Sequence, residues 1–185
     1  MSIERYVDIY KNVKNLLYNA YIDLYCLKVL GRIDNNDPTI SISKYSLIHL
    51  CEILKVDLCL NISKLCFDGD TRVASIINLQ NTLNSIYKEQ GKRENERIFT
   101  NKTMAQKDKV KAMRDKYIAH CDISRSLDDI YIADLQEIFE DARLFFNDLC
   151  DPSIDSNATS ISSIEMLYLT VRSTGFDKLI HDGAY

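Results

Sequence analysis

The residues best suited to chemistry lie together in one short segment of the sequence, residues 113–122. His120 is one of only three histidines in the chain, and Arg114 lies six positions before it. A histidine exchanges a proton near neutral pH, and an arginine binds phosphate oxygens through a planar set of N–H donors. These two groups suffice for cleaving RNA without a metal ion, because the 2′-hydroxyl of RNA is itself the nucleophile. The pair therefore indicates phosphodiester chemistry.

The stretch that leads to this pair is basic, although the whole chain has a formal charge of −4. Residues 101–116, called here the basic segment, hold six basic residues and two acidic ones. Because a local excess of this kind can follow a phosphate backbone, we expect Lys109, Lys111 and Lys116 to contact RNA. The ring of Tyr117 can stack on a base beside them.

The rest of the chain predicts the helices that must position these residues. Five glycines and two prolines in 185 residues are too few for the frequent turns of a β-sandwich or a barrel. Apolar residues recur at steps of three and four through residues 3–30 and 131–149, which predicts two long helices. Shorter helices are predicted at about 44–65, 73–87 and 102–119.

We therefore predict an all-α bundle of four to five helices over residues 1–151. Asp151 and Pro152 end the last long helix, and residues 152–185 are expected to form a linker and a short C-terminal helix. The two long helices should pack as antiparallel neighbours. The residues expected to be buried at their contact are Leu17, Leu24, Ile138 and Phe145.

The six cysteines predict free thiols in a reducing compartment. Cys51, Cys59 and Cys66 are spaced eight and seven residues apart, about 10 Å or more along a helix, which is too far for a disulfide. No zinc-type spacing is present, so we expect neither a metal site nor a cofactor. With no apolar run near the ~20 residues that span a bilayer and no signal-peptide pattern, we expect a cytoplasmic protein that does not enter membranes.

Two strings of this sequence resemble the HEPN superfamily, the nucleotide-binding domains of higher eukaryotes and prokaryotes. Arg114-x5-His120, with polar Asp115 directly after the arginine, is similar to the R-x4-6-H signature of that superfamily. The fuller string Met-Arg-Asp-Lys-Tyr-Ile-Ala-His-Cys-Asp looks like its abortive-infection branch, and so does the string at residues 58–68. The resemblance covers roughly residues 1–150, mostly by pattern.

The resemblance implies a bundle of four or five helices that forms a homodimer, with an endoribonuclease site made of one Arg/His pair from each protomer. His120 would transfer protons, Arg114 would hold the phosphate and Asp115 would orient a partner. Such proteins act as toxins or as effectors of phage defence, and a nucleotidyltransferase-type antitoxin would be a possible partner. In a helix, positions 114 and 120 differ by about 120° around the axis and by about 9 Å along it, which also favours a site shared by two copies.

Two simpler interpretations stay open. Arg114, Asp115 and Lys116 can form a solvated helix face, and His120 can balance the dipole at a helix C-terminus. In that case the protein is a catalytically silent helical module that binds a nucleotide or a partner protein.

Overall fold

The computed structural model describes residues 2–32, 43–120, 130–162 and 165–166, which form helices and loops and no strand. The all-α class is therefore confirmed. The elements in chain order are α1 (Ile3–Leu30), α2 (Lys44–Ile62), the π-helical turn η1 (Ser63–Phe67), α3 (Ile76–Glu89), α4 (Asn101–Ala105), α5 (Lys107–His120) and α6 (Ile132–Asp148).

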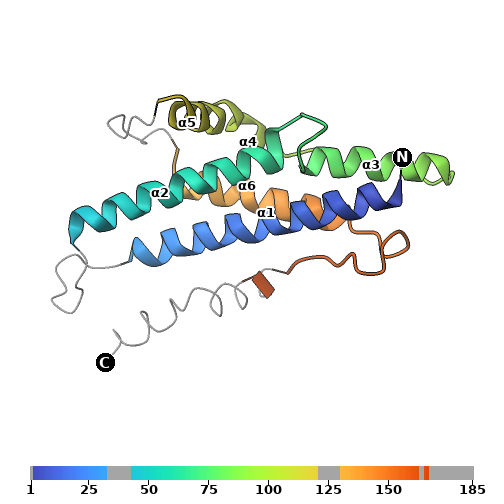
Figure 1. Ribbon diagram of the computed structural model, residues 1–185, viewed down its shortest axis with the longest axis horizontal. Coiled ribbons are helices and arrows are strands. Elements are labelled where there is room, and N and C mark those ends of the chain that lie inside the picture. The colour runs from blue at the N-terminus through green and yellow to red at the C-terminus, as the bar shows by residue number, and fades with distance from the viewer. Residues whose placement is uncertain (1, 33–42, 121–129, 163–164, 167–185) are drawn as a thin grey trace.

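The long helices α1, α2 and α6 run lengthwise and enclose the core, and α3 continues beyond the end of α2 (Figure 1). α1 and α6 are antiparallel, as predicted: the Tyr6 hydroxyl near the start of α1 donates a hydrogen bond of 2.7 Å to the carbonyl of Leu149 just beyond α6. α5 lies along the side of α2 and contacts α2, η1 and α4. The helix that carries the candidate residues is thus at the edge of the bundle.

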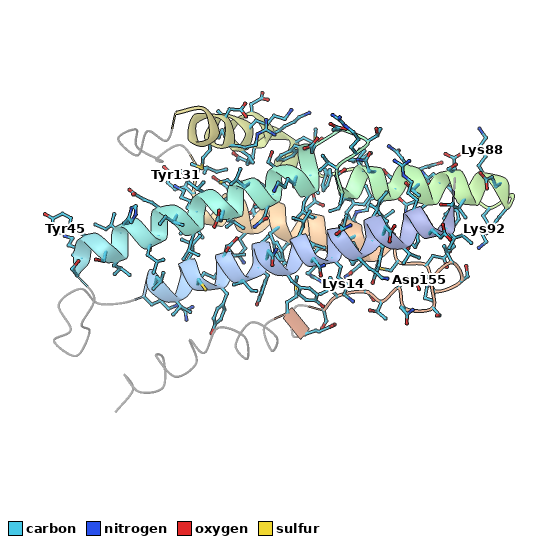
Figure 2. All side chains as sticks on the ribbon, viewed as in Figure 1. Lys14, Tyr45, Lys88, Lys92, Tyr131 and Asp155 are labelled. Atoms are coloured by element: carbon cyan, nitrogen blue, oxygen red, sulfur yellow. The ribbon has the colours of Figure 1, made fainter. Side chains whose placement is uncertain are left out.

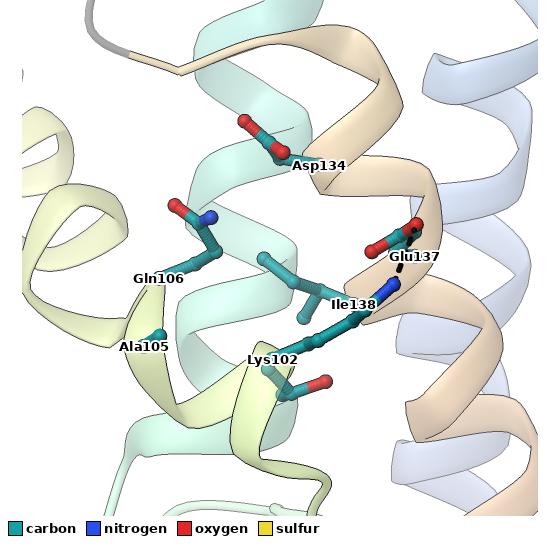
Figure 3. Close-up of a pocket in the computed structure, with 7 residues that line it drawn as sticks. Lys102, Ala105, Gln106, Asp134, Glu137 and Ile138 are labelled. Atoms are coloured by element: carbon teal, nitrogen blue, oxygen red, sulfur yellow. Dashed lines mark hydrogen bonds and ion pairs between the residues drawn. The ribbon is translucent and has the colours of Figure 1, made fainter.

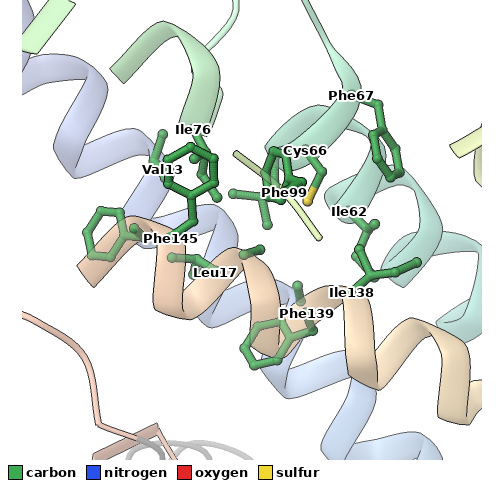
Figure 4. Packing of buried hydrophobic residues seen from close by; sticks show 14 of the residues in the cluster. Val13, Leu17, Ile62, Cys66, Phe67, Ile76, Phe99, Ile138, Phe139 and Phe145 are labelled. Carbon is green, nitrogen blue, oxygen red and sulfur yellow. The ribbon is translucent and has the colours of Figure 1, made fainter. Parts of the chain in front are cut away.

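The apolar stripe of α1 is buried along its length, as its spacing predicts. Ser2 starts the helix, because its hydroxyl accepts a hydrogen bond of 3.3 Å from the backbone N–H of Arg5. The four residues expected at the α1–α6 contact are all at most 2% exposed: Leu17, Leu24, Ile138 and Phe145. Figure 4 shows Leu17 and Phe145 in the same cluster as Ile62 of α2 and Ile76 of α3. One core therefore joins all four helices.

The single helix predicted over residues 102–119 is divided in the structure, where α4 ends at Ala105 and α5 begins at Lys107. The cause is a contact with α6. The backbone N–H of Thr100 and the hydroxyl of Thr103 donate to one carboxylate oxygen of buried Asp141, at 2.8 and 2.7 Å. These bonds hold α4 on α6, and the break at Gln106 lets α5 follow α2 instead.

The stretch predicted as a linker after Pro152 lies against the bundle as far as residue 162. The hydroxyl of Tyr10 donates to the carbonyl of Thr159 at 2.9 Å and accepts from its N–H at 2.8 Å. Asn147 of α6 pairs with both backbone groups of Ile161, whose side chain is fully buried. The hydroxyl of Ser162 accepts a bond of 3.0 Å from the N–H of Glu165, which agrees with a capped helix start. Residues 167–185 lie outside the described residues.

Two residues that the apolar periods of the predicted helices at about 44–65 and 131–149 place on the inner side are exposed instead. Ile48 of α2 is 46% exposed, and Tyr131, which precedes α6 and is labelled in Figure 2, is 71% exposed. Tyr131 is the N-cap residue of α6 and so lies outside its helical stripe. Ile48 lies near the start of a helix that carries apolar residues on every side, so periodicity alone does not select its inner face.

The cysteines within the described residues are free thiols, buried or half-buried, as expected. Burial raises the pKa of the Cys59 thiol to about 12, so it stays protonated and unreactive near neutral pH. None of the described helices has the length and the apolar character that crossing a membrane requires.

We predict that Phe145→Ala lowers the free energy of unfolding by about 3–5 kcal/mol, because the fully buried ring leaves a cavity between α1 and α6. Urea denaturation followed by circular dichroism measures the change. The matched control is Leu144→Ala at the next position, where the side chain is 46% exposed and the expected change is within about 0.5 kcal/mol. Equal effects at the two positions would contradict the core as described.

Candidate functional site

The two strings that resemble the HEPN superfamily lie in direct contact. Val110 and Met113 are the buried residues of α5 among those whose side chains are described. The thiol of Cys59, in the string at residues 58–68, donates to the sulfur of Met113 at 3.1 Å. Segments about 50 residues apart in the sequence thus form one unit, in which α5 packs on the end of α2.

The end of α2 widens into the π-helical turn η1, which forms the floor beneath α5. Ser63, Leu65, Cys66 and Phe67 are buried in this turn, and Lys64 alone is exposed. η1 contacts α1 and α3 as well as α5, so it is enclosed by three helices. Single π-helical turns are rare and occur often at functional sites.

Arg114 is held from two sides. Its Nη1 donates a hydrogen bond of 3.1 Å to the hydroxyl of Ser63, and its Nε donates one of 2.8 Å to the Asp115 carboxylate. The Arg114 side chain is 28% exposed, whereas that of Asp115 is 64% exposed. The guanidinium is therefore fixed and still reachable from solvent. Asp115, predicted to orient a partner, is in contact with Arg114 itself.

α5 continues without a break from Arg114 to His120. The two positions therefore lie about 120° apart around one helix and about 9 Å apart along it. The side chains of Lys116, Tyr117 and His120 lie outside the described residues, so their assigned roles stay predictions. Arg114 and Asp115 are the predicted catalytic residues whose side chains the structure places together.

The remaining lysines of the basic segment differ in their surroundings. Lys102 lies 3.5 Å from the carboxylate of Glu137, and both side chains are exposed. Lys109 is exposed and Lys111 half-buried, and among the described residues neither has a carboxylate within ion-pairing distance. These two lysines, predicted to contact RNA, lie on the same helix as Arg114.

A cavity of about 260 Å³ lies between α4 and α6, away from Arg114. In Figure 3, Lys102 reaches toward Glu137 on one side, and Gln106 and Asp134 lie on the other. Two carboxylates in its wall make this cavity unsuited to a phosphate group. Two of the lysines predicted to contact RNA, Lys109 and Lys111, are not among the residues that line this cavity.

A half-buried carboxyl group that sequence reasoning missed lies between α1 and α2. The side-chain amide of Asn61 donates a hydrogen bond of 3.0 Å to Asp23. Burial raises the pKa of Asp23 to about 6, against the opposing effect of the Asn61 bond, and the nearby charge of Asp57 raises it further. Asn61 and Ser63 differ by about 200° around α2, so Asp23 is on another side of α2 from Arg114. The signal in the sequence was an aspartate inside the apolar stripe of α1, between Ala20 and Leu24.

Among the described residues, no three His, Cys, Asp or Glu side chains are grouped as metal ligands would be. Comparison of the chain with family models, with curated proteins and with solved structures finds no match.

We predict that Asp23→Asn stabilises the protein more at pH 7.5 than at pH 4. The folded state holds the Asp23 proton up to a pKa of about 6, whereas the unfolded chain releases it near ~3.9. The stability of the native protein therefore falls as the pH rises through this window, and the asparagine variant lacks that loss. Urea denaturation at both pH values measures the difference. Asp8→Asn, at an exposed position of α1, is the control, and an effect of Asp23→Asn that is independent of pH would contradict the prediction.

Proposed function

We propose that this protein is an endoribonuclease of the HEPN type that needs no metal ion and acts as a toxin or a phage-defence effector. The observation that carries the proposal is the setting of Arg114, which is anchored by Ser63 and Asp115, partly open to solvent, and part of a basic helix. A phosphate clamp requires a positive group with a fixed orientation and access to the substrate. The contact between the two HEPN-like strings supports the same conclusion.

In this proposal RNA supplies the nucleophile and the protein supplies proton transfer and charge. His120 removes the proton of the 2′-hydroxyl, whose oxygen attacks the adjacent phosphorus. Arg114 stabilises the negative charge that develops on the phosphorane oxygens. The bond between phosphorus and the 5′-oxygen then breaks, His120 returns its proton to the leaving 5′-oxygen, and a 2′,3′-cyclic phosphate remains. Lys109, Lys111 and Lys116 bind neighbouring phosphates, and Tyr117 stacks on a base.

The proposed site is shared by two copies of the chain. One α5 helix presents positions 114 and 120 on different faces, whereas a two-fold axis beside α5 brings two arginines and two histidines together. Ala119 is small and allows the two backbones to come close. α5 lies at the edge of the bundle, where a second copy can reach it (Figure 1). A nucleotidyltransferase-type antitoxin would then restrain the toxin in the cytoplasm.

A second candidate, a catalytically silent module that binds a nucleotide or a partner protein, is favoured by one observation. The carboxylate of Asp115 lies 2.8 Å from the Arg114 guanidinium and partly neutralises it. An arginine whose charge is balanced in this way can stabilise the fold without taking part in catalysis. Activity measurements separate the two candidates.

We predict that the purified protein cleaves mixed RNA in the presence of EDTA, leaves single-stranded DNA intact and produces 2′,3′-cyclic phosphate ends. His120→Ala should reduce the cleavage rate by about 10²–10⁴-fold through lost proton transfer. Arg114→Ala should cause a loss of similar size because the transition-state charge is no longer stabilised. Gel analysis of labelled RNA and mass spectrometry of the ends measure these outcomes.

Lys109→Ala is the control that separates binding from chemistry. It should weaken RNA binding modestly and reduce the salt dependence by about one phosphate contact, with the same product ends. Cleavage that survives His120→Ala would indicate another site or a contaminant. A native protein that forms the dimer and cleaves no RNA would leave the silent module as the better explanation.

A further inference from the structure

We infer that Ser63 is a positioning residue that fixes the guanidinium of Arg114 for catalysis. The inference rests on the proposed function and adds to it a residue that the R-x5-H signature does not contain. It follows from a single hydrogen bond between elements far apart in the sequence: Arg114 Nη1 donates to Ser63 Oγ at 3.1 Å.

The two partners of Arg114 differ in how firmly each is held. Ser63 is fully buried, and its backbone N–H donates to the carbonyls of Cys59 and Leu60. Its hydroxyl therefore has a fixed place in the bundle. Asp115 is 64% exposed and is the next residue on the same helix, so it moves with Arg114 and does not tie the guanidinium to another element. Ser63 is thus the partner that sets the orientation of the guanidinium relative to the rest of the protein.

The geometry of η1 explains why a serine is suitable at this position. Ser63 is the first residue of the π-helical turn, which is enclosed by α1, α3 and α5. The neighbouring contact between Cys59 and Met113 holds α5 close to this turn. The short side chain of a serine therefore suffices to bring a hydroxyl to the guanidinium. The guanidinium has more N–H donors than Ser63 and Asp115 engage together, so it can bind a phosphate in the same orientation.

Removing this hydroxyl should impair turnover more than binding. In Ser63→Ala, Nη1 can turn to water because Arg114 is 28% exposed, and the positive charge stays in place. RNA should therefore bind nearly as before, with KM within about twofold. A guanidinium of Arg114 that is displaced by about 1 Å stabilises the transition state poorly, which should reduce kcat by about 10–100-fold.

The experiment compares Ser63→Ala and Ser63→Cys with a matched control on RNA cleavage. Cysteine keeps the shape of the side chain with a somewhat larger atom and accepts hydrogen bonds weakly, so it tests the role of the oxygen if the alanine variant folds poorly. The control is Ser75→Ala: Ser75 is equally buried, and its hydroxyl accepts a bond of 3.2 Å from the N–H of Asn78 at the start of α3. We expect reduced kcat with unchanged KM in both Ser63 variants and the native kcat in the control.

Nitrogen-15 NMR of the arginine side chains gives a result that does not depend on catalysis. The Arg114 signals, assigned with Arg114→Lys, should show a restrained guanidinium in the native protein and faster motion in Ser63→Ala. Unchanged Arg114 signals, or Ser63 variants that cleave at the native rate, would overturn the inference. A native protein that cleaves no RNA would refute the proposed function alone, and the NMR comparison would still decide whether Ser63 positions Arg114.

Discussion

The packing of α5 on the end of α2 is the contact on which the candidate site depends. Among its described side chains, α5 buries only Val110 and Met113, so a small apolar contact holds a charged helix. The bond between Cys59 and Met113 and the bond between Ser63 and Arg114 lie next to each other in this contact. Met113, which packs the helix, and Arg114, which presents its charge, are therefore neighbours. A substitution that disturbs the packing of Met113 should also change the position of the Arg114 guanidinium.

The large elements of the fold could be predicted because they depend on local periodicity. The stripes of α1 and α6 repeat at steps of three and four and bury the expected residues. The break between α4 and α5 could not be predicted, because it depends on Asp141, 38 residues beyond Thr103. The exposure of Ile48 was missed for another reason: α2 has apolar residues on all sides, and the neighbours that select its inner face come from elsewhere in the chain.

The residues of the candidate site also fall into two groups, those that could be predicted from the sequence and those that could not. Arg114 and Asp115 were identified from their types and spacing, and the structure places them in contact. Ser63 does not stand out in the sequence, and Asp23 stands out only as a charged residue within the apolar stripe of α1; their importance comes from partners 51 and 38 residues away. Long-range contacts of this kind do not follow from a pattern in one segment. The role of His120 stays a prediction from the resemblance and from the chemistry of histidine.

Hybrid dimers test most directly whether two copies of the chain build the proposed ribonuclease site. One subunit carries Arg114→Ala and His120→Ala together with an affinity tag, and the other subunit is native. A shared site needs groups from both subunits, so the purified hybrid should cleave RNA at less than about a tenth of the native rate. A hybrid with about half of the native rate would show that each chain holds a complete site of its own and would contradict the proposal.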